Sequence, residues 1–585
     1  MRERFYILIL LLVVFLMLSP SIRYDFTNWD DRGLVLGNSV IRSLSPSNIA
    51  RMFTPRAGGT YQPVRLLSYA IDYKLAGYSQ WIYHLHNILL YLLNILLVYL
   101  ILSHFFDRKY ASIGAFLFGF LPVHIESVVW VAARKEVLSG LFFFLAIYLY
   151  ILFRKEKNGW FFVLSIISSF LAILSKPSTI VLPGMLFLYD VALSERKFSR
   201  TNFILYIPYL FPAILAGVYF ILLAGTQSSF HTGGFIQTFF LEFYIAARYI
   251  LNLVFPYHLL PRYIVSAPVS FLDWRIIFGI VFAIVSIYLL LFTYKKNRKF
   301  FFALGWFYVG LIPVFNIVPI STLMADRYIY ISSFAYPFAL CVLLGRSKGL
   351  RRFVYPVFGL LLVWYAFSFV RMEKVWRNSE SLWSYVISVD PDHPLAHNNL
   401  GMVYVEEKKY ELAIPHFKAA LKSMPKYKSA FTNLSGAYLE SGRYSEAIFW
   451  GEKAMHLFPD DPKIIFNLGN AYARAGEPEK AIPLYRKLLE MKPNDVDVLV
   501  NLGIVYTYAG DWEKAAAHFQ RMLDSGMKDE VVYLNLASAY YKTGELDKAI
   551  GYFSEFLRLY PDSPDAPQVR KNVKLLKSMT DESKR

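Results

Sequence analysis

The chain has 585 residues, of which 56% are hydrophobic and 18% aromatic, and its formal net charge is +18. The apolar fraction exceeds the roughly 45–50% of an ordinary soluble domain, which excludes a wholly soluble protein. The bases form short clusters between apolar runs, as the positive-inside rule of membrane proteins predicts, so the charge does not indicate nucleic-acid binding. The single cysteine, Cys341, excludes an intramolecular disulfide.

Apolar runs dominate residues 1–372, and the remainder is polar and rich in Lys, Glu, Asn and Ala. A helix needs roughly 20 apolar residues to cross the hydrocarbon of a bilayer. We therefore predict an all-α fold, in which a polytopic transmembrane helix bundle precedes a helical repeat domain. About eleven spans are expected near residues 5–22, 86–106, 111–130, 137–153, 160–175, 178–192, 202–224, 275–293, 300–318, 328–344 and 353–371.

The first apolar segment, Phe5 to Leu18, follows basic residues, as the core of a signal peptide does. No small-x-small cleavage site follows it, because the chain continues Ser19-Pro20-Ser21-Ile22-Arg23. A retained span is therefore the favoured interpretation.

Six basic clusters in alternate loops predict the orientation of the spans. They are Arg2/Arg4, Arg108/Lys109, Arg154/Lys155/Lys157, Arg196/Lys197/Arg200, Lys295/Lys296/Arg298/Lys299 and Arg346/Lys348/Arg351/Arg352. With these clusters in the cytoplasm, the N-terminus is inside, and loops 23–85 and 225–274 and the repeat domain are outside. We expect a prokaryotic cytoplasmic (inner) membrane protein whose repeats are periplasmic or extracellular. Loop 23–85 itself carries seven bases and four acids, but it is 63 residues long, where the charge rule weakens.

The last third of the chain repeats with a period of 34 residues. Asn399-Leu400-Gly401 recurs in related form at 433–435, 467–469, 501–503 and 535–537. The period and the placing of small and aromatic residues are typical of tetratricopeptide repeats, which stack helix pairs into an α-solenoid. We predict a connecting half-repeat over 373–392, five repeats over 393–562, and a capping helix and tail over 563–585. The concave surface of such an array binds a protein or peptide partner.

Asn28-Trp29-Asp30-Asp31 follows directly after the first span. Paired carboxylates at a membrane interface are costly unless they have a task or a partner. Adjacent carboxylates repel, so one can hold a raised pKa and act as a general base, or both can bind a metal. The alternative is a solvated turn, in which Asp is common.

Further ionisable groups fall at the outer ends of the predicted spans. They belong to the stretches 61–65, 83–87, 121–126, 133–136, 175–177 and 325–330. Charged groups that converge on one face of a membrane bundle indicate a functional site. We expect Arg327 to line one pocket with Asp30 and Asp31, although nearly 300 positions separate them.

These motifs, in this order, resemble those of the transmembrane-and-tetratricopeptide-repeat O-mannosyltransferases of the type-C glycosyltransferase superfamily. The resemblance covers nearly the whole chain and its domain order. It rests on the Asp-Asp pair, Tyr61-Gln62-Pro63, Tyr83-His84-Leu85-His86-Asn87, Pro122-Val123-His124-Ile125-Glu126 and Arg327-Tyr328-Ile329-Tyr330. Where the family has Leu-His-Pro-Val-His, this chain has Phe120-Leu121-Pro122-Val123-His124, so one histidine and any role it has are missing.

The resemblance implies an inverting transfer of a sugar, with mannose the sugar in the family name, from a polyprenyl-phosphate donor to a hydroxyl of a protein acceptor on the external face. By this analogy Asp30 or Asp31 deprotonates the acceptor, because a Ser or Thr hydroxyl is a poor nucleophile until its proton is taken. Cations must meet the charge that grows on the lipid-phosphate leaving group. The candidates are Arg327, Arg65, Arg134 and Lys176.

The remaining candidates concern the sugar, the acceptor and a metal. Binding of the sugar or acceptor is assigned to His84, His124 and Glu126. His124 and Glu126 have two alternatives, metal binding or simple pairing with Arg134. A divalent metal, if one is used, is expected on Asp30 and Asp31.

Two other functions remain open. A non-enzymatic, membrane-anchored scaffold would use its repeats to assemble partners, but it gives no reason for so many ionisable groups at one membrane face. A transporter or flippase of lipid-linked sugar would place charges at mid-membrane and repeat its spans internally, and the sequence has neither feature. The sequence also lacks Gly-x-Gly-x-x-Gly, a phosphate-binding loop and Cys-x-x-Cys.

Overall fold

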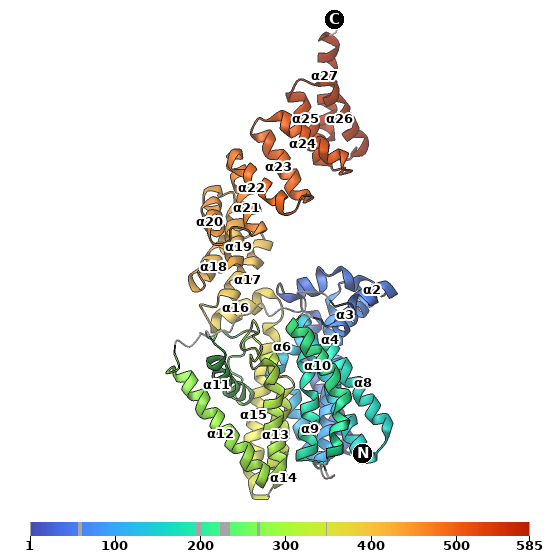
Figure 1. Cartoon of the computed structure of the whole chain (residues 1–585), viewed down its shortest axis with the longest axis vertical. Coiled ribbons are helices and arrows are strands. Elements are labelled where there is room, and N and C mark those ends of the chain that lie inside the picture. The colour runs from blue at the N-terminus through green and yellow to red at the C-terminus, as the bar shows by residue number, and fades with distance from the viewer. Residues whose placement is uncertain are drawn as a thin grey trace. The chain divides into compact units, whose positions relative to one another are not determined.

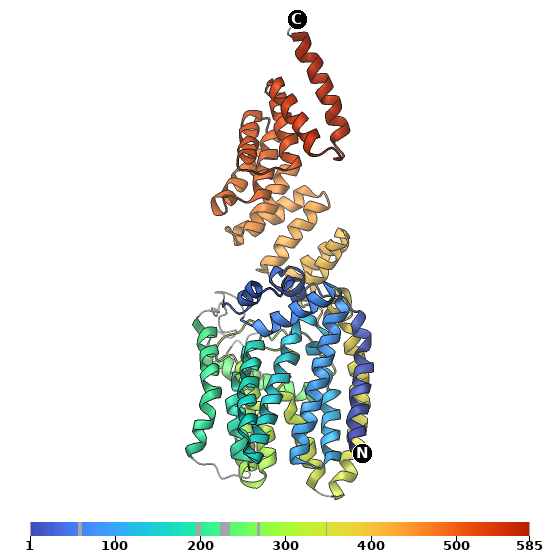
Figure 2. The same cartoon turned by 90° about the vertical axis from the view of Figure 1, so that its right-hand side faces the viewer.

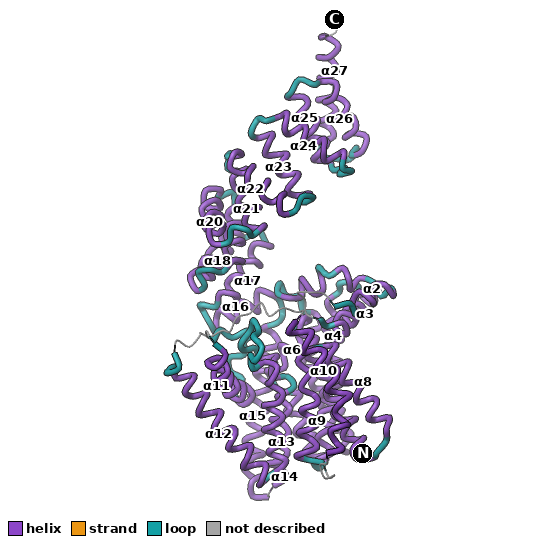
Figure 3. The backbone as a smooth tube through the Cα atoms, viewed as in Figure 1, coloured by secondary structure: helices purple, strands orange, loops and turns teal. Residues whose placement is uncertain are grey.

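Helices satisfy every backbone N–H and C=O within one segment, which is why apolar runs in a membrane fold into them. The computed structural model of the protein describes residues 2–55, 61–194, 200–222, 234–265, 270–346 and 348–583. All regular structure in these residues is helical (Figure 3), and Tyr263 and Met324 form only an isolated bridge. The predicted all-α fold is confirmed. The chain divides into two units, Met1–Val389 and Asp390–Arg585.

The first unit is a bundle of long helices that run alongside one another, with α2 and α3 at one end and the N-terminus at the other (Figures 1 and 2). Its α-helices are α1 (Arg2–Leu18), α2 (Pro46–Met52), α3 (Pro63–Ala76), α4 (Gln80–Phe105), α5 (Arg108–Gly119), α6 (Ile125–Val129), α7 (Arg134–Glu156), α8 (Gly159–Ser175), α9 (Leu182–Ala192), α10 (Ile207–Leu222), α11 (Phe235–Val254), α12 (Trp274–Lys296), α13 (Arg298–Leu311), α14 (Ala335–Arg346), α15 (Lys348–Val375) and α16 (Ser379–Val389).

Each predicted span overlaps helical structure, but the count of eleven is not confirmed. Within the described part of the chain, six helical stretches are long and apolar enough to cross a membrane. They are Tyr6–Arg23, Gln80–Phe105, Val131–Glu156, Phe203–Leu222, Trp274–Lys296 and Val354–Val375. A seventh span results if Arg108–Gly119 and Pro122–Val129, bent by 52° at their junction, cross as one. Gly159–Ser175, Pro177–Ala192 and Ser332–Gly345 are apolar but shorter.

Three α-helices lie in segments that were predicted to be external loops. Helices α2 and α3 lie within 23–85, and α11 lies within 225–274. Helix α11 was not predicted because only one face of it is apolar. Glu242, Arg248 and Asn252 interrupt its apolar run. An amphipathic helix of this kind gives no continuous hydrophobic segment.

The second unit contains five helix pairs and a final single helix. They are α17 (Pro394–Glu406), α18 (Tyr410–Ser423), α19 (Lys428–Glu440), α20 (Tyr444–Leu457), α21 (Pro462–Arg474), α22 (Pro478–Met491), α23 (Val496–Tyr508), α24 (Trp512–Asp524), α25 (Glu530–Lys542), α26 (Leu546–Leu559) and α27 (Ala566–Ser583). The periodic alanines Ala413, Ala447, Ala481, Ala515 and Ala549 are all fully buried. Small side chains there let the paired helices approach closely, as the repeat pattern predicts.

Four of the helix pairs turn at a glycine in the left-handed backbone region. The φ angles are 78° at Gly442, 80° at Gly476, 72° at Gly510 and 83° at Gly544. Glycine adopts this conformation at the end of a helix without steric cost. The first pair turns at Lys408 instead, with φ 58°.

Candidate functional site

Three breaks between helices meet at the end of the bundle opposite the N-terminus. They are the loop after α1, the segment between α5 and α7, and the segment between α13 and α14. The first two are joined where the backbone N–H of Ala132 donates to Asp31 Oδ1 over 2.7 Å. The last two are joined where Arg327 Nη1 lies 2.5 Å from Glu126 Oε1. Pro122 in the second segment and Pro319 in the third help to keep these segments out of long helices.

The two carboxylates of the Asp pair have different surroundings. Asp31 is 1% exposed, and its Oδ2 accepts hydrogen bonds from the backbone N–H and the hydroxyl of Thr27, both over 2.8 Å. Asp30 is exposed. Burial raises the pKa of Asp31 to about 6, against the lowering effect of the hydrogen bonds from Thr27 and Ala132. Asp31 therefore fastens the loop, and Asp30 is the carboxylate that solvent can reach.

Asp31→Asn is expected to remove a pH dependence of stability. The pKa of Asp31 in the folded protein, about 6, lies above its ordinary value of 3.8. Protonated Asp31 therefore stabilises the folded state fully below about pH 3.8, and this stabilisation is lost as pH rises through 6. The effect is about 1.4 kcal/mol per unit of pKa difference. Melting temperatures of the wild type and the variant measured at pH 4.5 and 7.5 check this. The wild type should lose stability relative to the variant as pH rises, and a constant difference would contradict the assignment.

Arg327 lies beside the Asp pair but is bound to Glu126. Its guanidinium carbon is 5.7 Å from the ring centroid of Trp29 and 5.5 Å from that of Trp130. Nη1 also donates to the Pro261 carbonyl over 2.8 Å. The guanidinium of Arg327 thus lies near the ring of Trp29, the residue before Asp30, and forms its ion pair with Glu126. The alternative in which Glu126 pairs with Arg134 is wrong.

Arg134 is held entirely by the protein interior. It is 0% exposed, and its Nη1 lies 2.5 Å from Asp72 Oδ2. Its Nε donates to Asn87 Oδ1 over 2.7 Å, and Nη2 donates to the Tyr83 carbonyl over 2.8 Å. Every face of this guanidinium is engaged, so Arg134 has a structural role in the bundle.

The neighbouring Lys135, which the sequence analysis did not select, has the opposite character. It is partly exposed and has no hydrogen bond or ion pair within the described residues. The charges that act on it are those of Arg65, Glu136, Arg327 and Lys176. Lys176 is the partnered member of this group, because its Nζ lies 2.5 Å from Glu136 Oε2.

Arg65 on α3 is a second cation without a partner. It is 3% exposed, its Nε has no hydrogen-bond partner in the described structure, and no carboxylate lies within ion-pair distance. The charges of Asp30 and Glu136 both act on Arg65, and the charge of Arg65 in turn acts on Lys135. A buried, unpaired guanidinium is costly, which makes Arg65, with the partly exposed Lys135 in its electrostatic range, a candidate for binding an anion.

The two candidate histidines are core residues. His124 is 0% exposed and shares hydrogen bonds with the Tyr91 hydroxyl at 3.0 Å and the Ser333 hydroxyl at 2.8 Å. His84 is 2% exposed. The described residues contain no group of three or more His, Cys, Asp or Glu side chains that could hold a metal ion.

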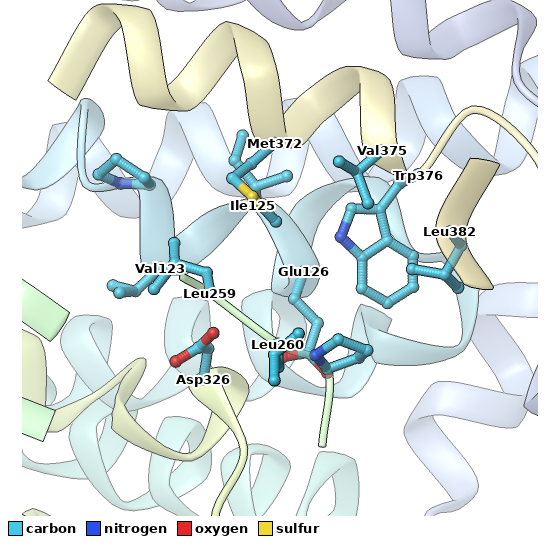
Figure 4. Close-up of a pocket in the computed structure, with 12 residues that line it drawn as sticks. Val123, Ile125, Glu126, Leu259, Leu260, Asp326, Met372, Val375, Trp376 and Leu382 are labelled. Atoms are coloured by element: carbon cyan, nitrogen blue, oxygen red, sulfur yellow. The ribbon is translucent and has the colours of Figure 1, made fainter. Parts of the chain in front are cut away.

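A small cavity is lined by Glu126 and Asp326 among apolar side chains (Figure 4). Its volume is about 10 Å³, room for at most about one water molecule, so it is not a sugar pocket. Asp326 accepts from the Tyr263 hydroxyl at 3.0 and 2.9 Å and from Asn252 Nδ2 at 3.1 Å. Burial raises the pKa of Asp326 well above its usual range. Its motif was recognised in the sequence, but its role as a buried anchor was not.

Comparison with known families identifies both parts of the chain. Residues 63–223 match the family described as dolichyl-phosphate-mannose-protein mannosyltransferase. Residues 392–460, 466–530 and 506–571 match tetratricopeptide repeats. Among solved structures, the repeat protein YrrB is 18% identical and covers 32% of this chain and 97% of its own, with a TM-score of 0.29.

The curated relatives that the chain resembles are named protein O-mannosyl-transferases. Human protein O-mannosyl-transferase TMTC1 is 24% identical and covers 63% of this chain and 48% of its own length. Mouse TMTC3 is 22% identical, with 68% and 49% covered. Caenorhabditis elegans protein O-mannosyl-transferase F38B6.6 is 25% identical, with 72% and 63% covered. The chain spans about half the length of the first two relatives.

Fold and site together define a polytopic membrane protein with a mannosyltransferase-like bundle and tetratricopeptide repeats. The resemblance to the transmembrane-and-tetratricopeptide-repeat O-mannosyltransferases, predicted from the motifs, is confirmed.

Proposed function

We propose that the protein is an inverting membrane glycosyltransferase that moves a sugar, mannose by analogy with its relatives, from a polyprenyl-phosphate donor to a hydroxyl of a protein acceptor. One observation carries this proposal. An exposed carboxylate, Asp30, lies in the electrostatic range of Arg65, a buried cation whose side chain has no partner in the described part of the chain, and the charge of Arg65 also acts on Lys135.

The chemistry needs a base at one side of the sugar and cations at the other. Asp30 takes the proton of the acceptor hydroxyl, whose oxygen then forms a bond to the anomeric carbon of the sugar. The bond between that carbon and the phosphate oxygen breaks, and the polyprenyl phosphate leaves with the bonding electrons. Because the displacement occurs in one step from the opposite face, the anomeric configuration inverts.

Arg65 and Lys135 are the residues we assign to the leaving phosphate. Neither has a hydrogen-bond or ion-pair partner for its side chain among the residues that the structure describes, and both are positioned by helices, α3 and α7. Preorganised cations that meet charge as it develops are worth most in a site shielded from water. Lys176 and Arg327 contribute at longer range, since each already pairs with a carboxylate.

The repeats are proposed to recruit the protein acceptor or other partners. Tetratricopeptide arrays present extended concave surfaces for such contacts. The scaffold alternative would account for the repeats alone, but it leaves the unpaired Arg65 and Lys135 without a purpose. The deciding assay is transfer from defined polyprenyl-phosphate sugars to a peptide acceptor by the purified full-length protein, and absence of transfer with every donor would contradict the enzymatic function.

We also propose that the chemistry and the repeats share the external side of the membrane. Within the first unit, Asn28 N donates to Ser379 Oγ over 2.7 Å, so the chain reaches α16 at the end of the bundle that carries the first loop. The basic clusters put the other end in the cytoplasm. A reporter that is active only in the cytoplasm, fused after residue 585, should therefore stay silent. The same reporter fused at the N-terminus should be active, and a signal from the C-terminal fusion would reverse the assignment.

A further inference from the structure

The loop that carries Asp30 is held from three sides. Asp31 is bound by Thr27 and by the backbone of Ala132, as described above. Asn28 is bound from α16, the half-repeat that ends the first unit at Val389. Trp29 is packed within a cluster of aromatic rings. Asp30 is the one residue of 28–31 that projects to solvent, so its position depends on how its neighbours are held.

Helix α16 and the residues just before it contact the loop through three hydrogen bonds. The backbone N–H of Asp25 donates to the Arg377 carbonyl over 3.1 Å. The backbone N–H of Asn28 donates to the Ser379 hydroxyl over 2.7 Å, and Trp383 Nε1 donates to Asn28 Oδ1 over 2.8 Å. Asn28 is therefore fixed through both its backbone and its side chain by residues some 350 positions away.

Aromatic stacking continues the same contact. The rings of Trp29 and Trp130 are stacked, with centroids 4.5 Å apart and 12° between planes, and Trp376 stacks on the other side of Trp130 at 5.5 Å. Trp383 meets Trp29 edge-on at 5.4 Å and is 0% exposed. Aromatic pairs in these geometries are worth about 0.5–1.5 kcal/mol beyond their buried area, so the cluster is a rigid support.

We propose that Ser379 and Trp383 are positioning residues for Asp30, so that the half-repeat is part of the catalytic unit as well as the start of the repeat region. This inference rests on the proposed function, in which Asp30 is the base. Neither residue contacts Asp30 itself. They act through Asn28, two residues before it, and set the direction in which the carboxylate meets the acceptor hydroxyl.

Paired substitutions in the full-length protein test this role. Ser379→Ala removes the hydroxyl that accepts from Asn28, whereas Ser379→Thr keeps a hydroxyl at this partly exposed position. We expect Ser379→Ala to lower kcat about tenfold at unchanged donor KM, within the roughly hundredfold that a 1 Å misplacement can cost. Ser379→Thr should restore kcat. Because kcat is expressed per folded enzyme, a loss of folding in Ser379→Ala does not count as a loss of positioning.

Trp383→Phe provides an independent variant, since it keeps an aromatic ring but removes the N–H donor together with the second ring of the indole. The matched control is Trp376→Phe, the same change in the same cluster, because the Trp376 indole makes no hydrogen bond within the described structure. We expect kcat to fall about tenfold in Trp383→Phe and to stay near wild type in Trp376→Phe. If Trp383→Phe does not fold, the comparison of Ser379→Ala with Ser379→Thr still tests the positioning role.

Failure of this inference is distinguishable from failure of the proposed function. Wild-type kcat in both Ser379→Ala and Trp383→Phe, with an inactive Asp30→Asn, would overturn the positioning role alone. Normal transfer by Asp30→Asn would show that Asp30 is not the general base, and the proposed function would fail with it.

Discussion

Asp30→Asn is expected to lower transfer about 10²–10⁴-fold, the usual contribution of a general base. The substitution keeps the size of the side chain and removes the proton acceptor. Asp30 is exposed and touches no described hydrogen-bond donor, so expression, membrane insertion and donor binding should persist. Initial rates with a peptide acceptor, together with donor binding measured separately, check this expectation.

Asp25→Asn is the matched control, because Asp25 is an exposed acid of the same loop whose backbone, and not its carboxylate, contacts Arg377. It should transfer at the wild-type rate. Asp31→Asn should affect transfer by another route, because it weakens the hydrogen bonds from Thr27 and Ala132 that fix the loop. Equal losses in Asp30→Asn and Asp31→Asn, together with abolition of wild-type turnover by a chelator, would favour a shared metal instead. Normal rates in both would reduce the pair to a polar turn.

The features that could be predicted from the sequence are those with local causes. The 34-residue period specifies the repeats because each helix pair contacts mainly its neighbours. Long apolar runs such as 86–106 and 275–293 specify membrane helices, since nothing else satisfies a backbone in hydrocarbon. The span count could not be predicted as well, because short apolar helices such as Gly159–Ser175 pass no length criterion on their own.

The division of roles within the site depends on contacts far along the chain. Asp30 and Asp31 are indistinguishable in sequence, and it is Asp31 that binds Thr27 nearby and the backbone of Ala132, 101 positions away. Arg134 and Lys135 present the same difficulty. Neighbours on a helix point about 100° apart, so one faces Asp72 in the core and the other the polar site, and the sequence gives no sign of which. The support of Asn28 by Trp383 joins residues too far apart for any motif to reveal.

Replacing the unpaired cations should weaken the use of the donor. Hydrogen bonds to charged groups contribute about 1.5–3 kcal/mol, so Lys135→Met or Arg65→Gln should each raise the donor KM about 10- to 100-fold. The loss in kcat/KM should exceed the rise in KM, because charge on the departing phosphate grows toward the transition state. Kinetics at varied concentrations of polyprenyl-phosphate sugar measure both quantities.

Lys155→Met is the matched control for Lys135→Met. It is the same substitution on the same helix α7, at an exposed position in the predicted cytoplasmic cluster, and it should leave the donor KM unchanged. Arg134→Met tests whether Arg134 is structural. It leaves Asp72 buried without its guanidinium partner, which typically costs about 3–5 kcal/mol of stability. The yield of folded protein should therefore fall. If Lys135→Met and Arg65→Gln both keep the wild-type donor KM, the leaving phosphate is bound elsewhere. The partnered cations Lys176 and Arg327 then become the candidates, because either can exchange its carboxylate for the phosphate.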